Sequence, residues 1–153
     1  MNVAKHTKRL GKEDVQLFQQ LIRLFGEVFE IQELTIPEEP YLLKLLENPD
    51  FFAYVTIADN EISGGLTAYK MASYYNEGAE IYIYDMAVKP SFQRQGLGKQ
   101  LILSLKEYCI HNNIQVMFVE ANIEDEHAVE FYHATGGNAE SVIHFNYYLK
   151  ETS

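Results

Sequence analysis

The sequence predicts an α/β (α+β) fold in which a mixed β-sheet carries helices on both faces, formed by one domain over residues 1–153. The length of 153 residues and the apolar share of 47% suit a single hydrophobic core. Apolar residues recur with helical spacing in some segments and form short strand-like runs in others. A glycine-rich loop also joins one strand directly to a helix, and another strand follows. This last arrangement is typical of a right-handed β-α-β crossover.

The first half of the chain is expected to supply two helices and then a hairpin. From Glu13 to Phe29 apolar residues recur at i, i+3, i+4 and i+7, and a shorter helix should follow Pro40. Two runs rich in β-branched and aromatic residues then flank Asp59-Asn60, a dipeptide typical of a tight hairpin turn. We expect these strands over residues 51–58 and 62–69, and a polar, exposed loop over residues 71–78.

The second half is expected to alternate strands and helices. A strand over residues 80–88 precedes the glycine-rich loop, a helix follows the loop, and Gly136-Gly137 should end the last helix. The remaining elements are expected as a strand over residues 114–121, a helix over 125–135 and a strand over 142–149. The element order is then β, α, α, β, β, β, α, β, α, β, with an antiparallel hairpin early and a parallel crossover late.

The loop Gln93-Arg94-Gln95-Gly96-Leu97-Gly98 is expected to bind an anion. Its glycines let the backbone turn sharply and approach a ligand, and the free N–H groups of a first helical turn point outward together. The helix dipole adds about half a positive charge at this end. Lys89, Arg94 and Lys99 flank it with full charges.

Two common phosphate-binding motifs do not fit this loop. A P-loop needs a glycine five residues before Gly98, and none is present. A dinucleotide fingerprint needs a third glycine where Leu101 stands. The spacing Gln93-x-x-Gly96-x-Gly98, after a strand ending in Asp85-Met86-Ala87-Val88, instead resembles the acyl-CoA pyrophosphate loop of the GNAT family of N-acetyltransferases.

A second motif strengthens the resemblance to the GNAT family. The spacing Ala128-x-x-x-Tyr132-x-x-x-Gly136 is similar to the family's Ala-x-x-x-Tyr-x-x-x-Gly-Phe, although Gly137 replaces the aromatic residue. Further segments resemble the short, GNAT-type aminoglycoside 3-N-acetyltransferases: Leu24-Phe25-Gly26-Glu27, Gly64-Gly65-Leu66-x-Ala68-Tyr69, Glu80-Ile81-Tyr82-Ile83-Tyr84-Asp85 and His144-Phe145. The resemblance implies a GNAT fold and transfer of acetyl from acetyl-CoA to the 3-amino group of an aminoglycoside.

The resemblance places acetyl-CoA, as cosubstrate, along the central strand and the loop. Backbone N–H groups at the end of this strand can polarise the thioester carbonyl as preorganised donors. The family also implies that this strand pairs with the pantetheine amides, and it implies no metal. The expected cofactor-binding residues are Met86, Ala87, Val88, Gln93, Arg94, Gln95, Gly96, Leu97, Gly98, Lys99 and Asn122.

Tyr132 and Asp85 are the expected catalytic residues. A departing thiolate of pKa ~8.5 can take a proton from a phenol of pKa ~10, and Tyr132 occupies the family position for that phenol. Asp85 interrupts a strand face that is expected to hold Ile81, Ile83 and Ala87. A buried carboxylate needs a partner, such as a cationic substrate amine. The base that takes the amine proton is expected to be Asp85, another carboxylate or a water.

The charge distribution favours a cationic small molecule and disfavours nucleic acid. The net charge is −10, and Glu27 to Asp50 hold seven carboxylates against one lysine, while no Lys or Arg lies between Glu107 and Leu149. Each acidic residue could equally be an ordinary surface group. The expected substrate-binding residues are Glu80, Tyr84, Asp85, Glu120, Glu124 and His144.

Two alternatives remain open at this point. The acceptor could be a polyamine or a peptide or protein amine, or the chain could be a non-catalytic module that only binds acyl-CoA. A cytoplasmic protein is expected, because no apolar run of about 18 residues is present and Cys109 is a lone cysteine. The resemblance and the aromatic Asn146-Tyr147-Tyr148 favour a homodimer.

Overall fold

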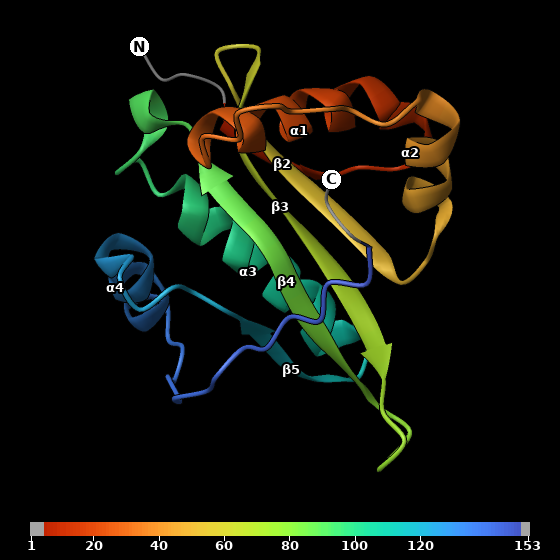
Figure 1. The fold of residues 1–153 in the computed structure, drawn as a ribbon, viewed down its shortest axis with the longest axis vertical. Coiled ribbons are helices and arrows are strands. Elements are labelled where there is room, and N and C mark those ends of the chain that lie inside the picture. Colours follow the sequence, from red (N-terminus) through yellow and green to blue (C-terminus); the bar gives the residue numbers. More distant parts are fainter. Residues whose placement is uncertain (1–4, 151–153) are drawn as a thin grey trace. The chain divides into compact units, whose positions relative to one another are not determined.

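The computed structural model describes residues 5–150 (Figure 1). The chain divides into two compact units, Met1–Glu120 and Ala121–Ser153. The first unit contains every described strand, and the second contains the helix α4 (Glu126–Ala134). A single domain over residues 1–153 stays a prediction.

The first unit is built on a five-stranded sheet in the order β1-β2-β3-β4-β5 (Figure 1). Neighbouring strands from β1 to β4 pair antiparallel, whereas β4 and β5 pair parallel. The predicted mixed sheet is therefore confirmed. The strands are β1 (Lys5–Arg9), β2 (Phe51–Ala58), β3 (Glu61–Ala72), β4 (Ala79–Val88) and β5 (Ile114–Val119).

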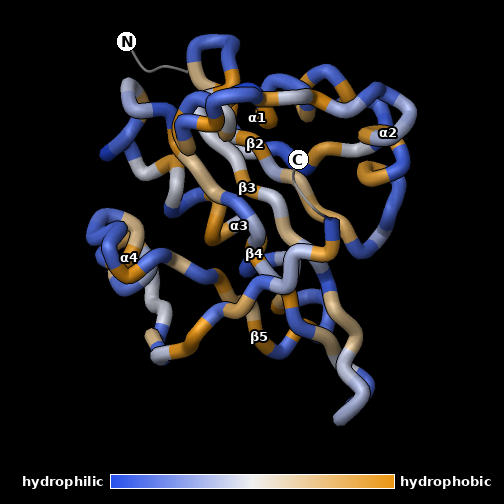
Figure 2. Tube along the Cα trace, viewed as in Figure 1, coloured by the Kyte–Doolittle hydropathy of each residue, from blue (hydrophilic) through white to orange (hydrophobic). Residues whose placement is uncertain are grey.

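Helices cover both faces of this sheet, as predicted. Side chains of α1 and α2 pack with Phe51 and Ala53 of β2 in one buried cluster. Phe52 lies between those two residues in the strand and so faces the opposite way, where its ring centroid lies 4.8 Å from that of Tyr108 on α3. Figure 2 shows both hydrophobic and hydrophilic residues in these helices, as amphipathic helices require. The helices are α1 (Val15–Val28), α2 (Glu39–Glu47) and α3 (Leu97–His111), with 3-10 turns η1 (Lys12–Asp14) and η2 (Pro90–Phe92).

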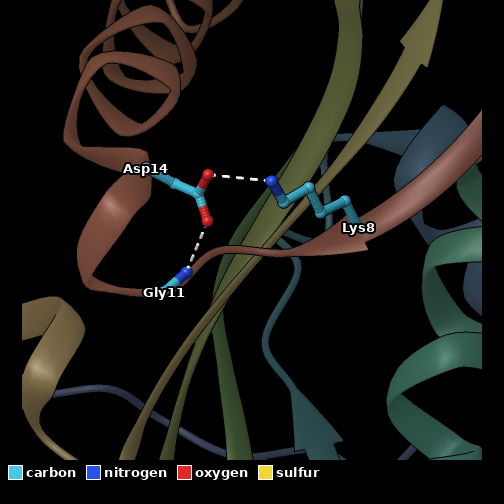
Figure 3. Close-up of polar contacts among 3 residues, drawn as sticks. All are labelled: Lys8, Gly11 and Asp14. Carbon is cyan, nitrogen blue, oxygen red and sulfur yellow. Dashed lines mark hydrogen bonds and ion pairs between the residues drawn. The ribbon is translucent and has the colours of Figure 1, made fainter.

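A hydrogen-bonded carboxylate joins the end of β1 to the start of α1 (Figure 3). Asp14 Oδ1 lies 2.8 Å from Lys8 Nζ, and Asp14 Oδ2 accepts a hydrogen bond of 2.8 Å from the Gly11 N–H. Burial acts to raise the pKa of Asp14, but the hydrogen bonds from Gly11 and Lys8 outweigh burial and lower that pKa. A charged carboxylate therefore ties the 3-10 turn η1, which leads into α1, to the end of β1.

The predicted hairpin is present, but β3 is longer than expected. Asp59 and Asn60 have φ angles of 54° and 62°, the left-handed values of a type I′ turn. Because β3 continues to Ala72, its connection to β4 spans residues 73–78, and the loop predicted over 71–78 was too long. Backbone pairing with the start of β4 extends the strand through residues whose polarity favours a loop. The strand predicted over 114–121 likewise ends earlier, at Val119.

The second unit contains α4, which begins and ends as predicted. Asp125 caps the helix by accepting a hydrogen bond of 3.1 Å from an N–H of the first turn. At the other end Gly136 has a φ of 101°, and the Gly137 N–H donates a hydrogen bond of 2.9 Å to the Tyr132 carbonyl. This is a Schellman motif, in which glycine adopts the left-handed conformation. Gly136-Gly137 therefore ends the helix.

The prediction of a strand over residues 142–149 was wrong, because these residues carry no strand in the structure. A strand is held by backbone hydrogen bonds to a neighbouring strand. The described residues of the second unit contain no other strand that could pair with this segment. Its β-branched and aromatic composition favoured a strand but could not provide that partner. Among the helices of residues 5–150, none is long and apolar enough to cross a membrane.

Gly65 of β3 lies against α1 and the neighbouring strand β2 with no room for a side chain. A Cβ atom there would lie 2.4 Å from Leu21 Cδ1 of α1 and 2.7 Å from the Tyr54 carbonyl oxygen of β2. The carbonyl belongs to a paired strand and cannot move without breaking the ladder. Only glycine therefore fits between the helix and the sheet.

Gly65→Ala is therefore expected to destabilise the protein by about 1–3 kcal/mol through overpacking. Urea unfolding followed by circular dichroism measures this change. Gly11→Ala is the matched control, because its Cβ would meet only carboxylate oxygens at the ends of side chains, Glu13 Oε2 at 3.0 Å and Asp14 Oδ2 at 3.9 Å. Equal stabilities for the two variants would contradict the close contact at Gly65.

Candidate active site

The strands β4 and β5 pair at one end and separate at the other. Their parallel ladder runs from the pair Ala79 and Ile114 to the pair Ile83 and Val119. β4 then continues to Val88 while still paired with β3 on its other side. Residues 84–88 thus present backbone N–H and C=O groups along an edge where the β5 ladder has ended, and such groups need partners. The expected backbone-binding residues Met86, Ala87 and Val88 lie in this stretch.

The glycine-rich loop follows directly at the end of β4. Gln93 Nε2 donates a hydrogen bond of 3.1 Å to the Val88 carbonyl, which holds the loop against the strand end. Arg94 and Gly96 have φ angles of 63° and 81°, and α3 begins at Leu97, the residue after Gly96. No side chain of the described residues caps this helix. Its first N–H groups therefore have no side-chain cap, and the binding of an anion there stays a prediction.

The loop is exposed and accessible to a ligand. Gln93, Arg94, Gln95, Gly96 and Lys99 are all exposed. A Cβ built at Gly96 would meet no heavy atom within 4 Å, so the space outside the turn is open. Of the predicted loop residues, Leu97 is instead buried, because its side chain packs into the core, and Gly98 is half-buried, so Gln93–Gly96 and Lys99 form the accessible surface.

Lys89 adds less positive charge to the loop than the sequence suggests. Its Nζ lies 3.8 Å from Glu61 Oε1, and this pair borders a hollow of about 220 Å³ that Arg23 and Glu27 of α1 also line. Opposite charges in this hollow partly neutralise one another. Arg94 and Lys99 are thus the loop's main expected cationic side chains.

Asp85 lies on the opposite sheet face from the one predicted. Ala68 of β3 pairs with Ile83, but the next residue, Thr67, pairs with Asp85, so Tyr84 is an extra residue in β4. This β-bulge shifts the alternation of side chains by one residue. Ile83 keeps the face of Ala68, whereas Asp85 shares the face of Thr67. The prediction that Asp85 shares a face with Ile81 and Ile83 was therefore wrong.

Asp85 is half-buried, beside the buried Thr67. Burial raises the pKa of Asp85 above its ordinary value of 3.8. A carboxylate with a raised pKa holds a proton more readily and is a stronger base once ionised. Asp85 is therefore chemically suited to take a proton from an amine or from a water.

A row of aromatic rings crosses the face on which Asp85 lies. Ring centroids are 5.2 Å apart for Phe51 and Tyr69, 5.9 Å for Tyr69 and Tyr84, and 5.8 Å for Tyr84 and Tyr82. Tyr82 then stacks on Phe118 of β5 with centroids 4.8 Å apart and ring planes 7° apart. This aromatic row extends from Phe51, in the buried cluster that contains α1 side chains, to Phe118, near the end of the β4–β5 ladder.

Glu120 ends the aromatic row with a carboxylate. Its Oε1 accepts a hydrogen bond of 2.6 Å from the Tyr82 hydroxyl. Sequence reasoning selected Glu120, Glu80 and Tyr84 but missed Tyr82, because its partner follows β5 and strand register is not readable from one sequence. Tyr84 and Glu80 are exposed on β4.

The other predicted site residues belong to the second unit. Tyr132 is half-buried on α4, and its ring centroid lies 5.3 Å from that of Phe131. Asn122 Oδ1 accepts a hydrogen bond of 3.0 Å from the Glu124 N–H, which shapes the turn before α4. His144 Nε2 lies 3.0 Å from Asn146 Oδ1. Within residues 5–150, no three His, Cys, Asp or Glu side chains are grouped to hold a metal ion.

Comparison with known proteins adds a family match. Residues 16–136 match the model of the acetyltransferase (GNAT) family. A segment of 69 residues is 32% identical to the [ribosomal protein bS18]-alanine N-acetyltransferase of Escherichia coli K12, and covers 45% of this chain. The chain thus spans only about half, 46%, of the length of that relative.

Solved structures of two metagenomic aminoglycoside acetyltransferases are similar to this chain over almost its whole length. An aminoglycoside acetyltransferase from an uncultured soil metagenomic sample is 41% identical, with a TM-score of 0.93, over 95% of this chain and 97% of that one. It has been crystallised with trehalose and with sisomicin. A second aminoglycoside acetyltransferase from an uncultured soil metagenomic sample is 36% identical, with a TM-score of 0.91, over 96% of this chain and 99% of that one.

The raised pKa of Asp85 predicts how stability changes with pH. Ionising Asp85 costs more free energy in the folded protein than in the unfolded chain. The free energy of unfolding should therefore fall as the pH rises from 3.8 through the pKa of Asp85 in the folded protein. Asp85→Asn cannot ionise, so it should be more stable than wild type at neutral pH and equally stable well below pH 3.8. Thermal unfolding across acidic to neutral pH measures the difference.

The exposed Asp50→Asn serves as the control for removal of a carboxylate alone. We expect no such pH-dependent gain for the control. A loss of stability in Asp85→Asn at neutral pH would show that the Asp85 carboxylate stabilises the free protein.

Proposed function

Because the chain belongs to the acetyltransferase (GNAT) family, we propose that it transfers the acetyl group of acetyl-CoA to the 3-amino group of an aminoglycoside. The observation that carries this proposal is the position of Asp85, half-buried beside the aromatic row where β4 and β5 separate. Similarity to an aminoglycoside acetyltransferase crystallised with sisomicin supports the choice of acceptor. The family match continues past Glu120, which supports one acetyltransferase domain over residues 1–153.

Acetyl-CoA is proposed to bind along β4 and the glycine-rich loop. The pyrophosphate would accept hydrogen bonds from the first N–H groups of α3, and Arg94 and Lys99 would add charge. The pantetheine amides would pair with the edge of β4 that β5 leaves free. A backbone N–H in the stretch Met86–Val88 would then donate to the thioester oxygen and stabilise the charge that develops there. Asn122 is proposed as a further contact.

The proposed reaction is a direct transfer. The neutral amine attacks the thioester carbonyl, the new C–N bond forms and the C–S bond breaks. Asp85 takes the amine proton, directly or through a water, and Tyr132 gives its phenolic proton to the departing thiolate. The aminoglycoside's other ammonium groups are proposed to contact a set of polar side chains: Glu80, Tyr84, Glu120, Glu124 and His144.

Two alternative functions would use the same site differently. A polyamine or a peptide or protein amine could replace the aminoglycoside, and the partial match to an alanine N-acetyltransferase supports the peptide alternative. A module that only binds acyl-CoA would make no use of Asp85. A cytoplasmic location and a homodimer stay predictions.

Thiol release from acetyl-CoA with a panel of amines tests the proposed function. We expect kcat/KM for an aminoglycoside to exceed that for a polyamine or an alanine-terminated peptide by at least about tenfold, or ~1.4 kcal/mol. The value should fall steeply with salt, because charge pairs at an exposed site are screened beyond about 10 Å at 0.1 M. NMR of the product identifies the acetylated nitrogen. Binding of acetyl-CoA without release by any amine would instead favour the non-catalytic module.

Tyr132→Phe keeps the ring and removes only the phenolic proton. We expect turnover to fall by roughly 10²-fold while the affinity for acetyl-CoA changes little. Tyr147→Phe, which removes an exposed phenol from the same unit, is the matched control. Unchanged turnover in Tyr132→Phe, with chemistry shown to limit the rate, would exclude this phenol as the acid.

A further inference from the structure

Tyr82 connects β4 to β5 at the end of their shared ladder. It pairs with Phe118, and only the pair Ile83 and Val119 follows before the strands separate. Its ring stacks on Phe118, and its hydroxyl reaches past that ring to Glu120. The ring and the hydroxyl of Tyr82 therefore make separate contacts. A substitution by phenylalanine removes the contact with Glu120 and keeps the stacking on Phe118.

The bond between Tyr82 and Glu120 is a short, charge-assisted hydrogen bond. Its length of 2.6 Å falls in the range of an O–H donor bonded to a carboxylate. This bond, more than burial, raises the pKa of Tyr82 to about 12. The raised pKa means that the phenol remains a donor to Glu120 at more alkaline pH than an ordinary tyrosine would. One oxygen of Glu120 is bound in this way, which restricts where the carboxylate can move.

Glu120 and Asp85 lie near the same end of the site but come from different strands. Asp85 follows Tyr82 on β4 by three residues, one of them the bulged Tyr84, while Glu120 directly follows β5. Both residues lie just beyond Ile83 and Val119, the last paired residues of the two strands. A molecule with two ammonium groups can contact two carboxylates at once, whereas a monoamine can contact only one.

We propose that Tyr82 is a positioning residue that holds Glu120 as a second anchoring carboxylate for acceptors with two or more ammonium groups. Asp85 faces the amine that reacts, and Glu120 binds an ammonium group that does not react. This inference rests on the proposed acetyltransferase function and explains a preference for polycations over monoamines. Tyr82 contacts Glu120 and does not touch the reacting atoms.

Tyr82→Phe is the decisive variant, because it keeps the ring on Phe118 and removes only the hydroxyl. Tyr108→Phe is the matched control, since it removes a phenol from α3 on the opposite face of the sheet. Glu120→Gln removes the charge but keeps an oxygen that can accept the phenol's hydrogen bond. All three are assayed for kcat and KM with an aminoglycoside, spermidine and the monoamine glucosamine, and their folding is checked by thermal unfolding.

Tyr82→Phe is expected to raise KM for the multiply charged acceptors by about tenfold, or ~1.4 kcal/mol, because Glu120 loses the hydrogen bond that positions it for the ammonium group. Its kcat, its KM for acetyl-CoA and its KM for glucosamine should stay within about twofold, and kcat/KM should depend less on salt. Glu120→Gln should show the same pattern. The double variant should lose little more than either single variant, because both changes remove one anchor.

Several outcomes would overturn the inference. Equal KM values for wild type and Tyr82→Phe, or an equal loss with glucosamine, would show that the hydroxyl does not serve a second ammonium group. If Tyr82→Phe lowers kcat and leaves KM unchanged, the hydroxyl acts in the chemical step and not in binding a second ammonium group. If Tyr82→Phe does not fold, an unchanged KM for spermidine and the aminoglycoside in Glu120→Gln overturns the inference, because Tyr82 would then hold a carboxylate that binds no ammonium group.

The panel separates this inference from the proposed function. A wild type that prefers spermidine refutes the aminoglycoside as acceptor, and the effect of Tyr82→Phe on spermidine still decides the role of Tyr82. A wild type that prefers glucosamine refutes both. A wild type that prefers the aminoglycoside, with Tyr82→Phe unchanged, refutes only the role of Tyr82.

Discussion

The extra residue in β4 determines which side chains meet at the candidate site. Tyr84 has no partner on β3, and every residue beyond it therefore faces the opposite side from a regular strand. Without this bulge Asp85 would face the apolar side that α3 covers, where an unpaired carboxylate is costly. With the bulge, Asp85 lies on the same sheet face as the aromatic row. Ala87 then pairs with Gly65, the residue against which α1 packs. The bulge at Tyr84 thus determines both which β4 side chain packs in the core and which one faces the candidate site.

Features that depend on local pattern could be predicted from the sequence. The hairpin turn at Asp59-Asn60, the Schellman ending at Gly136 and the glycine-rich start of α3 are each formed by neighbouring residues. Asp85 was selected for its charge within an apolar run, which is also a local signal. Its face was not predictable, because a bulge becomes visible only in the pairing with β3.

Features that depend on distant partners could not be predicted. Tyr82 and Glu120 are 38 residues apart, and only the register of β4 and β5 brings them together. The composition of residues 142–149 favours a strand, but a strand also needs a neighbour. Lys89 was counted as a charge of the loop, yet Glu61 from the start of β3 shares it. In each case the sequence indicates the chemical character of the residue or segment, but it does not indicate which distant residue, if any, is its partner.

The uncapped start of α3 has a thermodynamic consequence. α3 contributes the fully buried Leu101 and Leu105 to the apolar core, while its first N–H groups lack a side-chain cap. An anionic ligand that binds only the folded chain at these groups shifts the folding equilibrium by mass action. At a hundredfold excess over its Kd the gain is about 2.7 kcal/mol. The concentration of the acetyl donor in the cell would then influence the lifetime of the protein as well as its rate of turnover.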